Sequence, residues 1–181
     1  MSERTLSRAG TWEVQAWVRR ETWGYGSVLD FGSGLGAYTR VVLADVKDGI
    51  EAFEPYVLEA QADPENFGCR FFLGDMRDYE LFIDRSYDVA MFIDTLEHIP
   101  KEDALALIDK CKTKFSKIVL FLPLGKQEQE PCDGNELQRH LSFWDEDDIE
   151  AMDFKGVKFL NSQEGRDADS QHSAFLTWKR P

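Results

Sequence analysis

The chain has 181 residues, the length of one domain with at most a small appendage. It carries 21 Lys and Arg against 34 Asp and Glu, and the formal net charge of −13 argues against nucleic acid or an anionic membrane as a partner, since such surfaces are bound by basic patches. Three cysteines without metal-type spacing, no apolar signal-peptide core near the N-terminus and no apolar run of membrane-spanning length predict a reduced, cytoplasmic protein without a membrane segment.

Short apolar runs alternate with amphipathic stretches, which predicts an α/β fold with a mostly parallel sheet. Residues 11–23 are predicted to be helical and to serve either as core packing or as a lid over a site. The fourth predicted strand is nearly all apolar, so we expect it at the centre of the sheet. Five strands are predicted at 27–31, 50–53, 69–73, 87–93 and 118–122, the last ended by Pro123, with helices at 38–46, 56–62 and 100–112 between them.

The chain changes character after the fifth strand. Ten acidic residues and one basic residue, Arg139, lie between Glu128 and Asp153. Asp145 is predicted to cap a helix whose first turn is acidic, as the helix dipole favours. The alternative is an acidic rim that attracts a cationic substrate. Strands at 157–161 and 173–179, joined by a polar loop, predict a closing hairpin and bring the number of strands to seven.

The most informative stretch is Val28–Arg40, VLDFGSGLGAYTR. A strand that enters a glycine loop and then a helix places backbone N–H groups and a helix N-terminus beside a ligand. Glycines suit such a loop because its turns use backbone conformations that side chains disfavour. Gly32, Gly34 and Ala37 match a dinucleotide-binding pattern, and Glu54 is then the acidic residue about 20 positions downstream that holds a ribose. The pattern alone does not separate a dinucleotide from other nucleoside cofactors.

Several further motifs follow in order, and with them the sequence resembles the class I S-adenosylmethionine-dependent methyltransferases from about Ser27 to the C-terminus. The loop from Asp30 to Gly36 is similar to the family's acidic-x-Gly-x-Gly-x-Gly motif. Glu54, within AFEPY, matches the acidic residue after strand two, and Asp75-Met76, within FFLGDMRD, match the strand-three position. Asp94 to Ile99 (DTLEHI) resembles the run after strand four in small-molecule methyltransferases. The antiparallel last strand also fits the family.

The resemblance implies roles for individual residues. Glu54 is expected to bind the ribose hydroxyls, and Asp75 to accept from the adenine amine with Met76 beside it. Asp30 is expected either to meet the methionine end of the cofactor or to brace the loop by accepting backbone hydrogen bonds. The full set of expected cofactor-binding residues is Asp30, Gly32, Ser33, Gly34, Gly36, Glu54, Pro55, Asp75, Met76, Asp94 and Thr95.

Asp94, His98 and His140 are the candidate catalytic residues. Asp94 is expected where methyl donor and acceptor meet. Imidazoles titrate near neutrality, so His98 and His140 are the side chains by type that could remove a proton from a hydroxyl or protonated amine. For both histidines a structural role is the alternative, and His172 is predicted to be structural. No His, Asp and Glu residues show metal-ligand spacing, so no metal is predicted.

We therefore expect a three-layer, doubly wound α/β sandwich whose seven-stranded, mostly parallel sheet ends in an antiparallel hairpin. Residues 1–24 would form a helical extension and residues 25–181 a class I methyltransferase domain. The expected reaction moves a methyl group from S-adenosyl-L-methionine to an O or N atom of a small molecule, releasing S-adenosyl-L-homocysteine. Alternatives are a non-catalytic S-adenosylmethionine-binding sensor or regulatory subunit, a methyltransferase of a protein or carrier-bound acceptor, and a nucleotide-binding Rossmann protein. The sequence predicts no particular oligomeric state.

Overall fold

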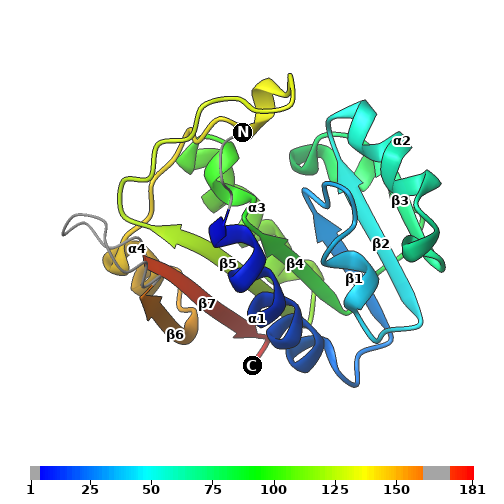
Figure 1. Cartoon of the computed structure of the whole chain (residues 1–181). Helices are drawn as coiled ribbons and strands as arrows, with labels where there is room; N and C mark the ends of the chain where they lie inside the picture. The colour runs from blue at the N-terminus through cyan, green and yellow to red at the C-terminus, as the bar shows by residue number, and fades with distance from the viewer. Residues whose placement is uncertain (1–4, 161–171) are drawn as a thin grey trace.

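A seven-stranded mixed sheet forms the centre of the computed structural model, which describes residues 5–160 and 172–181 (Figure 1). The strand order is β3-β2-β1-β4-β5-β7-β6. The first five strands are parallel, and β7 is antiparallel to both β5 and β6. This confirms the predicted fold and its closing hairpin. The strands are β1 Ser27–Phe31, β2 Val46–Glu51, β3 Cys69–Leu73, β4 Val89–Ile93, β5 Lys117–Leu124, β6 Lys155–Leu160 and β7 His172–Lys179.

Helices cover both faces of the sheet (Figure 1). On one face, Val14, Trp17 and Val18 of α1 (Thr5–Thr22) pack against alternate residues of β1, β4 and β5, so α1 is part of the core and not a lid. On the other face, α3 (Lys101–Lys114) and α4 (Glu146–Ala151) pack in a second core with the intervening strand residues. The remaining helix, α2 (Glu54–Ala62), buries Val57 and Ala60 against β3. No helix in the described part of the chain is long and apolar enough to span a membrane.

The segment between β1 and β2 differs from its prediction. An α-helix over 38–46 was expected, but only a 3-10 turn at Thr39–Val41 forms, and β2 already begins at Val46. The polar residues Lys47 and Asp48 near the start of β2 interrupt the run of apolar residues by which a strand is recognised. Asp48 is only 1% exposed, and its carboxylate accepts hydrogen bonds from Arg70 at 2.6 Å and from the hydroxyl of Tyr87. These bonds replace the hydrogen bonds to water that the buried carboxylate loses.

Two proline positions also differ from expectation. Pro123 does not end the fifth strand, because β5 continues to Leu124. The neighbouring β4 ends opposite Phe121, so at Pro123 one edge of β5 has no strand partner and a missing N–H is tolerated. Pro100 precedes α3 as its N-cap instead of being its first residue.

The predicted cap at Asp145 is confirmed. Its side chain accepts from the backbone N–H of Asp148, and the Asp148 side chain accepts from the Asp145 backbone N–H, which forms a reciprocal capping box at the start of α4. The acidic first turn of this helix therefore has a structural role. The loop expected between the last two strands falls on residues 161–171, outside the described residues.

Candidate cofactor and acceptor site

A cavity of about 290 Å³ lies at the carboxyl ends of the parallel strands. Its walls come from the turns after β1, β2, β3 and β4 and from the segment between β5 and α4, which is yellow in Figure 1. The neighbours β1 and β4 continue in opposite directions across the sheet, and such a switch point is where open α/β sheets bind ligands. The lining residues are Gly32, Gly34, Ile50, Glu51, Ala52, Gly74, Asp75, Met76, Arg77, Asp94, Thr95, His98, Ile99, Pro100, Leu137, Gln138 and Leu141.

The glycine loop presents backbone to this cavity. Gly32, Gly34 and Gly36 all have positive φ, and a Cβ on Gly32 would lie 2.5 Å from the Cγ2 of Thr95. The loop is tied to β2 through the N–H groups of Gly32 and Ser33, which donate to the carbonyl of Ile50 at 2.8 and 3.0 Å. Because only a 3-10 turn follows, the α-helix N-terminus expected beside the ligand is absent.

The carboxylate that β2 brings to the cavity is Glu51. It is the last residue of the strand, is 7% exposed, and its two oxygens accept from the N–H groups of Gly34 (3.0 Å) and Phe53 (2.8 Å). Glu54, predicted for this place, begins α2 as an exposed residue outside the lining, and Pro55 follows it there. The second strand was predicted too late in the chain: β2 ends at Glu51 instead of at Phe53, so the acidic residue at the end of this strand is Glu51.

Asp75 and Met76 line the cavity, as expected, at the turn after β3. Asp75 is paired with Arg77, whose side chain donates to both carboxylate oxygens and also reaches Asp103 at 2.8 Å. The hydrogen bonds from Arg77 lower the pKa of Asp75. This wall of the cavity therefore carries an ionised carboxylate held in one orientation.

Asp30 does not line the cavity. It is 2% exposed and accepts from the hydroxyl of Thr39 at 2.6 Å, beneath the glycine loop. Burial raises its pKa to about 7, and the nearby charge of Glu51 acts in the same direction. The bond ties the end of β1 to the 3-10 turn that follows the glycine loop, and the two roles expected of Asp30 stay predictions.

The turn after β4 supplies side chains to the cavity. Asp94 adopts a left-handed conformation with φ of 49°, unusual for a residue other than glycine, and its carboxyl group is open to the cavity. Removal from bulk water in this concave site raises its pKa to about 7. Thr95 is buried, and its hydroxyl lies 3.0 Å from the carbonyls of both Phe31 and Ile93. This bond joins the β4 turn to the end of β1.

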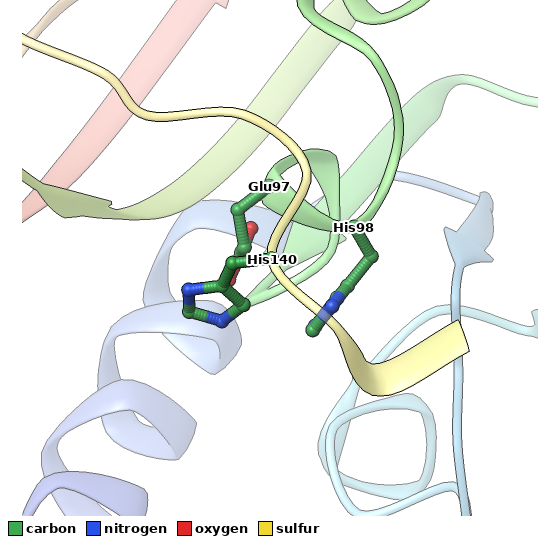
Figure 2. A group of neighbouring side chains, drawn as sticks. All are labelled: Glu97, His98 and His140. Carbon is green, nitrogen blue, oxygen red and sulfur yellow. The ribbon is translucent and has the colours of Figure 1, made fainter. Parts of the chain in front are cut away.

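His98 and His140 lie side by side, with ring centroids 5.0 Å apart. His98 lines the cavity, whereas His140 stands behind it. Burial lowers the pKa of both imidazoles, that of His98 to about 4, so both are neutral near pH 7. Glu97, which the sequence did not single out, joins them (Figure 2). It is 1% exposed, and burial together with the charge of Asp94 holds its pKa well above the usual range.

The cavity thus gathers most, but not all, of the predicted residues. Gly32, Gly34, Asp75, Met76, Asp94, Thr95 and His98 line it, while Asp30, Ser33, Gly36, Glu54, Pro55 and His140 do not. Sequence reasoning missed Glu51 and the apolar wall formed by Ile99, Leu137 and Leu141. The glycine two residues before Glu51 was the available signal for the former, since Gly49 leaves room for the side chain of Ser33. The apolar wall lies in irregular segments that carry no periodicity.

The sheet order, the glycine loop and the carboxylates at the strand ends agree with the resemblance to the class I S-adenosylmethionine-dependent methyltransferases. Residues 28–115 match a family model described as a methyltransferase domain. The chain therefore contains a methyltransferase domain. A comparison with curated proteins finds no match.

Solved structures support the same fold. The N-terminal domain of EvdMO1 with S-adenosylhomocysteine bound is 13% identical, with a TM-score of 0.68 over 94% of this chain and 81% of that chain. Magnesium protoporphyrin IX methyltransferase from Synechocystis PCC 6803 with bound S-adenosylmethionine is 20% identical, with a TM-score of 0.65 over 96% of this chain and 79% of that chain. DhpI in complex with S-adenosylhomocysteine is 18% identical, with a TM-score of 0.67 over 98% and 89%.

Proposed function

We propose that the domain transfers a methyl group from S-adenosylmethionine to an oxygen or nitrogen atom of a small-molecule acceptor and releases S-adenosylhomocysteine. One observation carries the proposal: a single cavity brings together the glycine loop, the β2 carboxylate Glu51, the β3 carboxylate Asp75 and the β4 turn at Asp94. These are the parts that a nucleoside with a charged amino-acid tail requires. The solved structures with similar folds hold S-adenosylmethionine or its product.

The ribose of the cofactor is assigned to Glu51 in place of Glu54. A carboxylate has about four lone-pair positions. The two backbone N–H groups that donate to Glu51 orient its carboxylate and leave other lone-pair positions available. Two adjacent hydroxyls can therefore bind to it. The adenine is assigned to the Asp75–Met76 turn, and the methionine tail to the backbone of Gly32 and Gly34.

Methyl transfer is an in-line displacement in which the acceptor lone pair attacks the methyl carbon and the C–S electron pair returns to sulfur. The enzyme contributes mainly alignment, since the sulfonium is already activated. Asp94, open to the cavity, is placed to orient the acceptor or take its proton. Leu137 and Leu141, half-exposed at 50% and 54%, line the same cavity and suit an acceptor with an apolar part.

Calorimetric titration with S-adenosylhomocysteine tests the cofactor assignment, with NAD as the comparison ligand. We expect saturable binding of S-adenosylhomocysteine and none of NAD. Glu51→Gln should weaken binding by about tenfold or more, equivalent to about 1.4 kcal/mol. Glu54→Gln, the matched control three residues away, should bind within about twofold of wild type because its side chain faces solvent.

Each other outcome overturns a defined part of the proposal. Binding of NAD instead would replace the methyltransferase by a dinucleotide-binding protein. A loss at Glu54→Gln with none at Glu51→Gln would move the ribose to α2. Binding without any release of S-adenosylhomocysteine from S-adenosylmethionine, across a panel of hydroxyl and amine acceptors, would favour the non-catalytic sensor.

A further inference from the structure

Glu97, His98 and His140 form a compact group next to the cavity. One potential ligand atom from each lies within 4.8 Å of the other two. Figure 2 shows that Glu97 and His98 project from the turn after β4, while His140 comes from the segment between β5 and α4 and meets them. Spacing along the chain does not reveal this group, because only the fold brings His140 to the other two residues.

The backbone around the group is rigidly tied. The carbonyl of Glu97 accepts from the N–H groups of Leu141 (2.7 Å) and Ser142 (3.1 Å), which binds the two segments together directly beside His140. The hydroxyl of Ser142 also donates to the carbonyl of Leu96 at 3.2 Å. Ligand positions are therefore held by contacts independent of the ligand side chains.

Both imidazoles are oriented in the way metal-binding histidines are. The Nδ1 of His98 is bonded to the carbonyl of Arg139 at 3.2 Å, and the Nδ1 of His140 to the carbonyl of Gln127. A carbonyl only accepts, so Nδ1 carries the proton in each neutral ring and Nε2 keeps its lone pair. A second-sphere carbonyl on one nitrogen with the other nitrogen unprotonated is the usual arrangement at metal sites.

The carboxylate of Glu97 lacks a partner for one oxygen. Its Oε2 is buried, and among the described residues it has no hydrogen bond. A buried oxygen left without a partner costs about 1–3 kcal/mol, and more when the group is charged. Asp94 lies close enough for its charge to act on Glu97. Two neighbouring carboxyl groups and two imidazole lone pairs together form a donor set suited to a cation.

We propose that Glu97, His98 and His140 bind a divalent metal ion. Two nitrogen ligands and one carboxylate favour a first-row transition ion such as Mn²⁺, Fe²⁺ or Zn²⁺ over Mg²⁺, which prefers oxygen ligands. Small side-chain rotations are needed to bring the ligand atoms to about 2.0–2.2 Å from the ion, the distances typical of nitrogen and oxygen ligands of Zn²⁺. Because His98 also lines the cavity, the ion would lie at its acceptor side, where an acceptor oxygen could complete the coordination.

This role at the acceptor side rests on the proposed function, but metal binding itself does not. The test is titration of the purified, metal-free chain with Mn²⁺. Binding is measured as the loss of the electron paramagnetic resonance signal of the free ion. We expect one saturable site. Glu97→Gln and His140→Asn should each weaken it by about tenfold or more, since each removes a ligand. Glu150→Gln, an exposed carboxylate on α4, is the matched control and should leave it unchanged.

Two companion measurements keep the result interpretable. Thermal unfolding and binding of S-adenosylhomocysteine are measured on every variant, so that a misfolded variant is recognised and His140→Asn serves if Glu97→Gln fails to fold. Absence of a saturable Mn²⁺ site in wild type, or a site equally strong in both cluster variants, would overturn the metal proposal. Mn²⁺ binding without S-adenosylhomocysteine binding would support the metal proposal and contradict the proposed function.

Discussion

The turns that follow β1 and β4 lie next to each other at the carboxyl edge of the sheet but meet the cavity differently. The β1 turn exposes backbone: its left-handed positions are glycines, and the buried acid before it, Asp30, does not line the cavity. The β4 turn presents side chains to the cavity: its left-handed residue is Asp94, and Thr95 and His98 line the cavity beside it.

The difference separates two tasks. A glycine turn can approach any cofactor of the right shape closely, and it discriminates little by charge. A turn of side chains can select and activate, at the expense of strain and buried charge. In the function proposed above, the first kind of turn holds the methionine tail of the cofactor and the second faces the acceptor.

The strongest test of the β1 side concerns Asp30. Its pKa in the folded protein is raised from 3.8 to about 7, so its contribution to stability is present below pH 4 and is lost as pH rises through 7. Wild type should therefore lose up to about 4 kcal/mol of unfolding free energy from this one group, at about 1.36 kcal/mol per pH unit. Asp30→Asn should lack this loss. Urea unfolding of both proteins from pH 4 to 8 measures it, and parallel curves would contradict the prediction.

Placing a side chain in the backbone turn should have the next largest effect. Gly32→Ala puts a methyl group 2.5 Å from Thr95 Cγ2 at a φ of +67°, which should cost about 3 kcal/mol from overlap and strain together. Gly34→Ala, with φ of +53° and nothing within 4 Å, should cost only the strain. Chemical denaturation compares the two. Equal costs would mean that the contact with Thr95 does not limit the turn.

The bond between the two turns is tested by Thr95→Val. It keeps the volume but removes the hydroxyl that lies 3.0 Å from the carbonyls of Phe31 and Ile93, and the free energy of unfolding should fall by about 1.5 kcal/mol. Thr22→Val is the control, because the hydroxyl of that equally buried threonine donates only to Val18, four residues earlier in its own helix. A Thr95→Val protein no less stable than Thr22→Val would show that the two turns are not coupled through this hydroxyl.

The smallest expected effect concerns strain at Asp94. Asp94→Gly and Asp94→Ala both remove the carboxyl group, and they differ in how well they accept a φ of 49°. The glycine variant should be the more stable by about 1 kcal/mol, the usual cost of a left-handed alanine. Melting curves of the two variants give the difference directly. An alanine variant of equal stability would mean that the turn relaxes once the side chain is gone.

Much of the fold could be predicted because buried strands appear in the sequence as short runs of apolar residues. The strands β1, β3, β4 and β5 were located to within two residues at every end. The start of β2 could not be found in this way, because Lys47 and Asp48 resemble a loop until Arg70 and Tyr87 are known to lie beside Asp48. Because of that single error, the acidic residue expected at the end of the second strand was Glu54, three residues beyond Glu51.

The group of Glu97, His98 and His140 was harder to predict for a related reason. The Glu97–His98 pair is visible in the sequence, but His140 reaches it through an irregular segment anchored by backbone hydrogen bonds from Leu141 and Ser142. Such bonds leave no trace in residue type. Long-range contacts made by backbone groups are what pattern reasoning cannot recover.

The placement of β7 has a consequence for how the chain reaches this state. The last strand in the sequence lies between β5 and β6, so β6 has no partner until β7 has been made. A chain still emerging from the ribosome could complete β1 to β4 and their turns, but the outer edge of the buried strand β5 would stay open. β7 must therefore pair with β5 before β6 can join the sheet, and long-range pairing of this kind is slow. Until that pairing is complete, the open edge of β5 should be the part of the chain most prone to aggregation.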